Sequence, residues 1–290
     1  MNTTTWAWMI GVVAAIGAQA AQDNNKPPPI RAFDLPTIES LGRRIYEQDD
    51  YAARATDALV AKIGAISGVA EQGIRGWIVQ NDETGALVRF IKETEAEPTA
   101  AYDIRFALDK IPFVSIPSSP ELTLDQTILY RARQQGIQSI SEMCSPGYNT
   151  VVLPDPDGDG FLVYALAGTT NSNVIPIGGH YRFTVSSDGS HVEQTDRLSA
   201  SCFTLPKRSP DLSEGCELAA YYMTHVVSDT PVETHVFLQL QLGKPFFVLT
   251  KSNVVWKIEN GVISHSDTAV ASSESPTAGQ DGNTEEDMHP

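Results

Sequence analysis

The fold is decided by one stretch, Asn149–Cys202, with the sequence NTVVLPDPDGDGFLVYALAGTTNSNVIPIGGHYRFTVSSDGSHVEQTDRLSASC. Its first part contains two runs rich in β-branched and aromatic residues, 149–153 and 161–166. Between them lies PDPDGDG, residues 154–160, a cluster of the residue types that form turns. This pattern predicts a β-hairpin.

The next part of the stretch, residues 180–186, alternates between apolar and polar side chains. One face carries Tyr181, Phe183 and Val185. The other face carries His180, Arg182, Thr184 and Ser186. A period of two is typical of a strand, and this one is predicted to have one side in water.

The N-terminus has the pattern of a secretory signal peptide, residues 1–20. An apolar run at 6–18 ends in Ala18-Gln19-Ala20, which a signal peptidase can cleave. The run is shorter than the roughly 20 apolar residues that a membrane-spanning helix needs, and no later segment approaches that length. We therefore expect a periplasmic or secreted protein with no integral membrane segment in the mature chain.

The charge of the chain excludes several kinds of partner. With 36 acidic and 20 basic residues, the net charge is -16. Nucleic acids and anionic membranes are bound through clustered Lys and Arg, so neither is an expected partner. The acidic segment 264–290 has no Lys or Arg and few large apolar residues, which predicts a disordered tail. Residues 21–36, with Pro27-Pro28-Pro29, are predicted to form an extended leader.

The remaining residues, 37–263, are predicted to form a single α+β domain. Helices are expected at 38–63, with Thr37 as N-cap, and at 124–135, with a capping box of Thr123 and Gln126 and a stop at Gly136. Further strands are expected at 76–81, 86–92, 102–108, 218–227, 234–242, 245–250 and 254–259. This order predicts two early helices on mainly antiparallel sheet, with a β meander in the C-terminal half and no alternating βαβ units.

The hairpin tip resembles the start of a calcium-binding loop. Asp155, Asp157 and Asp159, followed by Gly160, match D-x-D-x-D-G, in which alternate carboxylates converge on one ion. Position twelve is Leu166 rather than the bidentate Glu of such loops. The alternative interpretation is a solvated acidic turn.

The histidines are the other candidate ligands. A polar groove is predicted from His180, Arg182, His225 and His235. With Glu233 or Asp229, the three histidines could hold zinc and activate a water for hydrolysis. The alternative is that they are hydrogen-bonded structural groups. No H-E-x-x-H, G-x-S-x-G, P-loop or G-x-G-x-x-G string supports a known hydrolase or nucleotide-binding site.

Three cysteines allow one disulfide in an exported chain. Cys202 can pair with Cys216 across a short loop or with Cys144 across a longer one. Loop-closure entropy grows slowly with length and does not choose between them. No C-x-x-C pair is present, which disfavours cysteine-bound zinc.

Several segments resemble a family of secreted bacterial proteins of unknown function. They are CSPGYNTVVL (144–153), GGHYRFTVS (178–186), LSASC (198–202), THVVSDTPVETHVF (224–237) and KPFFVLT (244–250). The family keeps two cysteines that match Cys144 and Cys202, so the resemblance implies that these two form the disulfide and that Cys216 is the odd thiol. It implies no activity, cofactor or catalytic residue.

The sequence therefore favours an exported, non-catalytic binding or structural module of the bacterial cell envelope, with no cofactor unless calcium or zinc binds at the sites above. The first alternative is a metal-dependent hydrolase that uses the histidines. The second is a redox protein that uses a thiol, which Glu214 and Glu217 beside Cys216 disfavour because a reactive thiolate needs electropositive surroundings. The partner is not predicted.

Overall fold

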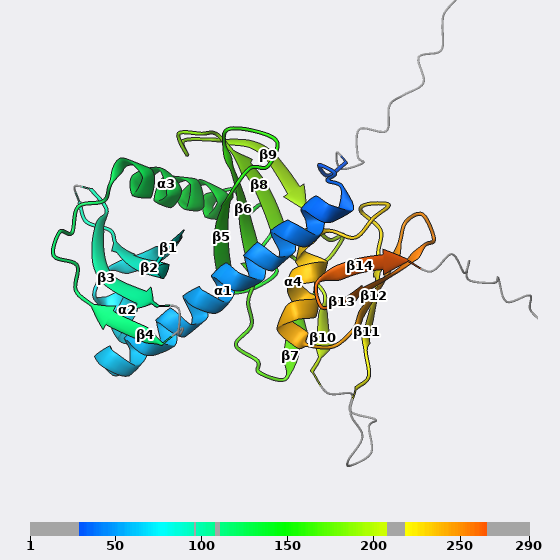
Figure 1. Cartoon of the computed structure of the whole chain (residues 1–290), viewed down its shortest axis with the longest axis horizontal. Helices are drawn as coiled ribbons and strands as arrows, with labels where there is room; N and C mark the ends of the chain where they lie inside the picture. Colours follow the sequence, from blue (N-terminus) through cyan, green and yellow to red (C-terminus); the bar gives the residue numbers. More distant parts are fainter. Residues whose placement is uncertain (1–28, 96, 108–110, 208–217, 266–290) are drawn as a thin grey trace, which may run out of the picture.

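The protein has an α+β architecture, seen in a computed structural model that describes residues 29–95, 97–107, 111–207 and 218–265 (Figure 1). The predicted signal peptide, residues 21–28 of the leader, Cys216 and residues 266–290 of the acidic tail lie outside this part. The helices within it are α1 (Leu35–Ile63), α2 (Ile66–Glu71), α3 (Leu124–Gln138) and α4 (Glu233–Leu242).

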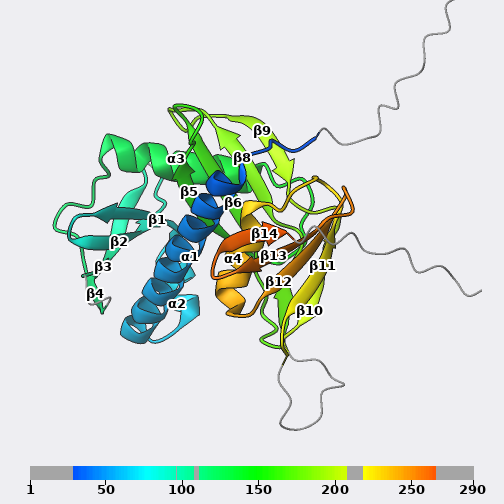
Figure 2. The ribbon, with the colours of Figure 1, turned by 45° about the vertical axis from the view of Figure 1, so that its right-hand side comes forward.

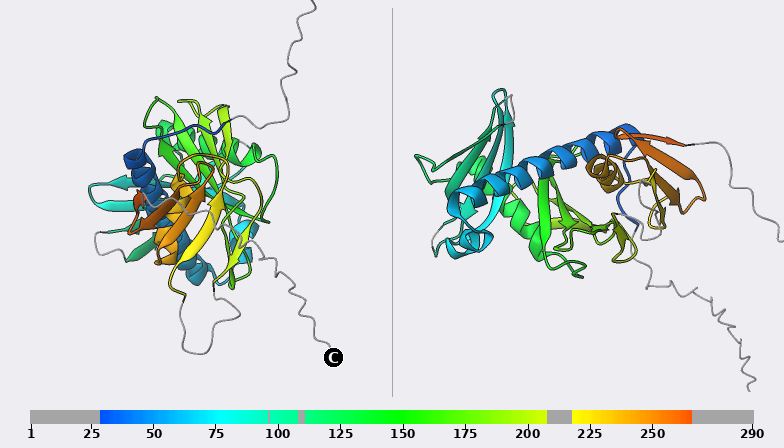
Figure 3. Two further views of the ribbon diagram at one scale, coloured as in Figure 1. Left: turned by 90° about the vertical axis from the view of Figure 1, so that its right-hand side faces the viewer. Right: turned by 90° about the horizontal axis from the view of Figure 1, so that it is seen from below.

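Helix α1 runs along the length of the molecule and contacts sheets at both ends (Figures 1 and 3). It begins at Leu35, three residues before the predicted start, because Asp34 rather than Thr37 caps it: the Asp34 carboxylate accepts from the Thr37 N–H at 2.9 Å. Pro36 fits the first turn, where its missing N–H is not needed. The helix ends at Gly64, whose positive φ of 92° suits glycine. None of the helices in the described ranges is both long and apolar enough to cross a membrane.

The first sheet packs on the C-terminal half of α1. Its strands, in spatial order, are β1 (Ile74–Asp82), β2 (Gly85–Lys92), β3 (Thr99–Phe106) and β4 (Pro112–Ser115). All neighbours are antiparallel, as expected for the predicted strands 76–81, 86–92 and 102–108. Ala55 and Leu59 of α1 share a core with Val88, Ile104 and Phe106 of the sheet.

The central sheet is formed by the stretch Asn149–Cys202, on which the fold prediction was based, together with the residue before it. Its strands, in spatial order, are β5 (Tyr148–Pro154), β6 (Phe161–Ala167), β8 (Tyr181–Val185) and β9 (Val192–Arg197). The predicted hairpin is β5–β6, with Pro154 opposite Phe161. The predicted wet side of β8 is wrong, since every residue of this strand is buried. Helix α3 covers one face of the sheet, and α1 and α4 lie on the other side, so both faces are inside the protein.

Helix α3 has the predicted capping box, in which the Gln126 N–H donates to Thr123 Oγ1 and the Thr123 N–H donates to Gln126 Oε1. It does not stop at Gly136. That glycine instead lets the helix approach the central sheet, because a Cβ there would lie 2.6 Å from Val163 Cγ1. The helix continues to Gln138.

The C-terminal sheet corrects another prediction. Its strands, in spatial order, are β11 (Tyr221–His225), β12 (Phe246–Thr250), β13 (Val255–Glu259) and β14 (Val262–His265). β12, β13 and β14 form the predicted meander, which takes in the first two residues of the predicted tail. The segment 234–242, predicted as a strand that carries His235, is the helix α4, which connects β11 to the parallel strand β12 and packs between α1 and this sheet (Figure 2). A two-stranded sheet of β7 (Val174–Pro176) and β10 (Thr204–Pro206) lies beside it.

Candidate functional site

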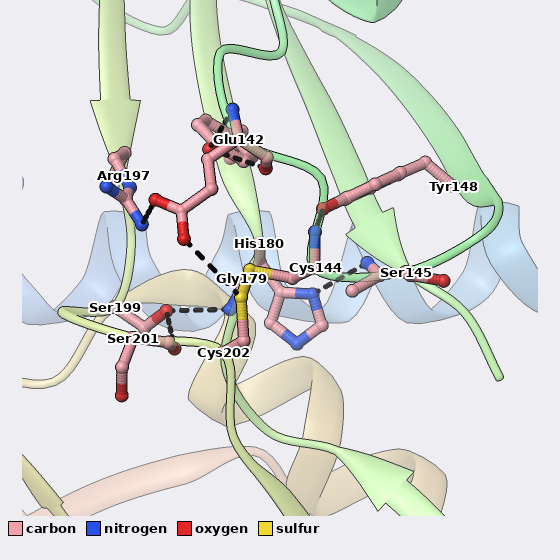
Figure 4. Close-up of a disulfide and its surroundings, with 12 residues drawn as sticks. Glu142, Cys144, Ser145, Tyr148, Gly179, His180, Arg197, Ser199, Ser201 and Cys202 are labelled. Carbon is pink, nitrogen blue, oxygen red and sulfur yellow. Dashed lines mark hydrogen bonds and ion pairs between the residues drawn. A yellow bond between two sulfur atoms is a disulfide. The ribbon is translucent and has the colours of Figure 1, made fainter.

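Cys144 and Cys202 form a disulfide, as the family resemblance implied (Figure 4). Their Cα atoms are 5.2 Å apart, within the range that a disulfide requires. The bond joins the connection after α3 to the segment after β9. Glu142 lies beside it and forms a 2.8 Å ion pair with Arg197. Glu142, Cys144 and Cys202 are the one group of three potential metal ligands that converges among the described residues, but both sulfurs are consumed in the disulfide.

The disulfide packs against the backbone that positions His180. Gly179 has a positive φ of 86°, and a Cβ there would collide with the side chain of Cys144. Its N–H donates to Ser199 Oγ at 2.7 Å. The glycine therefore lets the chain pass tightly beside the disulfide immediately before His180.

His180 has a buried hydrogen-bond donor without a partner. The Ala167 N–H donates to Nδ1 at 3.0 Å, so the proton of the neutral ring resides on Nε2 (Figure 4). Nε2 is buried and makes no hydrogen bond of good geometry with any described residue, and the whole residue is 2% exposed. Burial lowers the pKa of His180 to about 4, and the Pro176 carbonyl, which is near the ring but outside hydrogen-bonding geometry, acts in the opposite direction. The ring is therefore neutral at physiological pH.

His180 lines a cavity of about 300 Å³, here called the His180 cavity. This volume is at the lower end of the range of small-molecule sites. Its walls come from α1, β5, β6, β7, α4 and the residue after β10. The polar lining consists of Asp49, Asn149, Thr169, His180, Lys207 and Gln241. The apolar lining consists of Leu166, Ala167, Val174, Ile175, Pro176, Phe237, Leu238 and Leu242, with Gly168 between the two sets.

Asp49 is the acidic residue of this cavity, and the sequence interpretation did not single it out. It is 8% exposed and accepts a 3.1 Å hydrogen bond from Asn149 Nδ2. Burial raises the pKa of Asp49 to about 6, partly offset by the Asn149 hydrogen bond. The signal in the sequence is its position on the buried stripe of α1, four residues after Ile45 and three before Ala52.

His225 and His235, the other two predicted groove histidines, lie in contact with each other but inside the core. Their ring centroids are 4.5 Å apart, with the planes perpendicular. His225 Nε2 is 2.7 Å from Ser228 Oγ, and His235 Nδ1 accepts from the Val232 N–H at 3.1 Å. Burial lowers the pKa of His225 to about 4, and burial together with both neighbouring histidines holds that of His235 far below its ordinary value. Within the described residues, the histidines do not form a group of three converging ligand atoms, with each other or with a carboxylate.

Arg182, the fourth predicted groove residue, belongs to a buried ion cluster. It is 1% exposed, pairs with Asp196 at 2.7 Å and with Glu233, and donates to the Arg31 carbonyl. Burial opposes its charge, but the two carboxylates keep the pKa of Arg182 above its ordinary value. It is a structural cation rather than a groove residue.

The acidic hairpin tip binds an arginine. Arg31 Nη1 and Nη2 lie 2.6 and 2.8 Å from the two oxygens of Asp155, and Nη2 is 3.0 Å from Asp157. Asp159 is exposed and does not converge with the other two carboxylates. A guanidinium thus pairs with two of the carboxylates that the D-x-D-x-D-G pattern suggested for calcium, the buried Asp155 and the exposed Asp157.

Comparison with protein-family models, with curated proteins and with solved structures finds no match for this chain. The interpretation of the site therefore rests on its geometry.

Proposed function

We propose that this protein is an exported, non-catalytic binding protein whose ligand site is the His180 cavity. The observation that carries the proposal is the unpartnered Nε2–H of His180, which lines a cavity that also contains the buried carboxylate of Asp49. A buried donor without an acceptor costs about 1–3 kcal/mol, and a ligand that accepts from it removes this cost. Convergent polar groups, one with a raised pKa, in a cavity of this size are typical of a binding site.

Three features support export to the periplasm or beyond. The disulfide is a bond that persists in oxidising compartments and is rare in the cytosol. The leader at residues 1–20 has the pattern of a signal peptide. The resemblance to secreted bacterial proteins points in the same direction.

The hydrolase alternative has less support. His225 and His235 are adjacent and buried, and although His225 lines a second pocket, the ligand atoms of the two histidines do not converge with a third ligand in the described residues. Among the described residues, no Ser or Cys nucleophile lines the His180 cavity beside its histidine. The binding proposal needs neither feature.

The proposal is tested by site-resolved NMR. A set of small amines, polyols and carboxylates is added to ¹⁵N-labelled protein, and the signals of the His180 ring and of the cavity backbone are followed. We expect one class of compound to shift the His180 ring signals, because its acceptor replaces the missing partner of Nε2–H.

The matched variants place tryptophan at two exposed glutamines. Gln241→Trp fills the mouth of the His180 cavity from α4 and is expected to abolish these shifts. Gln138→Trp, at the end of α3 and outside the cavity, is expected to preserve them. If no compound shifts the cavity signals, the cavity holds only ordered water and the proposed function is wrong.

A further inference from the structure

The charge in the His180 cavity limits the chemical class of ligand that it can bind. Asp49 makes no ion pair with any residue in the described part of the chain, and Asn149 supplies its one side-chain hydrogen bond. An amide can orient a carboxylate, but it does not neutralise it. A ligand cation beside Asp49 would compensate this charge inside a low-dielectric site, where such pairing is strongest.

The rest of the protein favours a cation as well. The net charge of -16 attracts cations to the surface and repels anions before any specific contact forms. His180 is neutral, so it does not oppose a positive charge in the cavity. Lys207 is exposed where it lines the cavity, so it marks the mouth rather than the interior.

His180 adds a second requirement. Its Nε2–H needs an acceptor, which a bare metal ion or a simple alkylamine does not provide. The apolar wall, which includes Leu166, Phe237 and Leu238, suits a short hydrocarbon portion. The ligand must therefore combine a cation, an acceptor and an apolar part.

We propose that the His180 cavity binds a small protonated amine that also carries a hydrogen-bond acceptor, with the ammonium group at Asp49 and the acceptor at His180 Nε2. This inference rests on the proposed function. Amino alcohols and amino acids share this chemistry. They differ at the acceptor, where a carboxylate would also interact with Lys207 at the mouth.

Four probes with the same branched hydrocarbon end separate the contributions, measured by calorimetry on the full mature protein. Leucinol has the amine and a hydroxyl, isohexanol lacks the amine, isoamylamine lacks the hydroxymethyl group, and leucine carries a carboxylate. We expect leucinol to bind about tenfold to a hundredfold more tightly than isohexanol, because it makes a charge-assisted hydrogen bond. Isoamylamine should bind more weakly than leucinol because the His180 donor stays unpaired.

The variants assign each contact. Asp49→Asn should remove the preference for leucinol over isohexanol, whereas Asp50→Asn, at the next and exposed carboxylate of α1, should preserve it. If the natural ligand is an amino acid, Lys207→Gln should weaken the binding of leucine and leave the binding of leucinol unchanged. If Lys207→Gln does not change the affinity for leucine, the amino alcohols are the favoured ligand class.

The failures of the two proposals are distinguishable. If leucinol and isohexanol bind equally, and Gln241→Trp still abolishes binding of both, the cation inference is wrong and the binding function stands. The same holds if only uncharged or anionic compounds shift the His180 signals. If no compound of any class binds in the cavity, both proposals are wrong.

Discussion

Asp49 is a buried carboxylate that forms no ion pair with any cation in the part of the chain that the structure describes. Such a group costs stability when it is charged, and its one hydrogen bond to Asn149 does not remove the cost. A side chain that weakens the free protein but faces a cavity is better explained by a ligand than by folding.

Asp49→Asn should therefore stabilise the ligand-free protein. The folded pKa of Asp49 is raised from 3.8 to about 6, so the charged form is disfavoured above pH 6 and the cost fades as pH falls toward 3.8. We expect a gain of about 1–3 kcal/mol in the free energy of unfolding at about pH 7.5, and roughly half of that at about pH 5. Urea unfolding at both pH values measures it.

Asp50→Asn is the control for this measurement, because Asp50 is exposed, pairs with Arg54 at the surface, and has the smallest of the three influences on the pKa of Asp49. Its effect should be within about 0.5 kcal/mol at either pH. A loss of stability in Asp49→Asn at both pH values would show that the carboxylate has a structural role.

The sequence predicts that Asp49 lies on the buried side of α1, but it does not predict that Asp49 faces a cavity. Periodicity places it on the buried stripe of α1, yet Asn149 and Gln241 come from segments about a hundred and two hundred residues away. Only the packing of α1 against α4 and the central sheet brings these groups to one cavity. The disulfide could be predicted because the family resemblance implied which two cysteines pair.

Helix α4 shows why local pattern misled the sequence interpretation. The segment Glu233–Leu242 alternates apolar and polar residues near its end, which imitates a strand. In the structure its first seven residues are all buried, so it has no single apolar stripe that periodicity could detect. The parallel pairing of β11 with β12 requires a crossover, and that tertiary requirement determines the helix.

The segment before α1 is tied to the central hairpin by one arginine. Arg31 forms a two-point ion pair with Asp155, whose side chain is 5% exposed. Arg31→Gln should lower the free energy of unfolding by about 1–3 kcal/mol, because it leaves a buried carboxylate without its cation. Thermal or urea unfolding measures the loss.

Lys257→Gln is the matched control, since Lys257 pairs with Glu259 at the exposed surface of β13. Exposed pairs contribute little, so this variant should change stability by less than about 1 kcal/mol. Equal losses of stability in the two variants would show that the Arg31–Asp155 ion pair contributes no more than an exposed pair.

The disulfide ties two connections that flank the central sheet. It spans 58 residues of sequence, for which the chain-entropy account gives a stabilisation of about 4 kcal/mol. The double variant Cys144→Ala, Cys202→Ala should lose about this amount, and reduction of the native protein should lower its melting temperature comparably. Cys216→Ala should leave the melting temperature unchanged, and a similar loss in that variant would contradict the assignment.

The whole molecule is organised by α1, which contacts the first sheet, the central sheet and the C-terminal sheet. Strands β1, β2, β3, β5, β6 and β8 were predictable because their patterns are local, whereas the short strand β4 was not predicted. Burial of both faces of β8 was not predictable, since α3 and α4 cover it from distant parts of the chain. The same convergence buries His180, His225 and His235 together in the interior.

These three buried histidines should make the protein labile in acid. Their folded pKa values lie below the ordinary 6.5, at about 4 for His180 and His225 and well below 6.5 for His235. The unfolded chain therefore takes up protons that the folded protein does not, and stability is lost as pH falls from about 6.5 to 4. His180 and His225 each account for about 3 kcal/mol of this loss, so together they approach the stability of a typical domain.

As the pH falls, protonation of Asp49 in the folded protein restores a smaller amount of stability over a similar pH range. We therefore expect cooperative unfolding between about pH 4 and 5, which circular dichroism can monitor. The sharper measurement is the slope of unfolding free energy against pH between about 5 and 6, which counts the protons taken up on unfolding. His225→Gln should reduce that count by close to one, whatever it does to stability at neutral pH. His191→Gln, at an exposed histidine, is the control. An unchanged slope in His225→Gln would mean that acid unfolding has another origin.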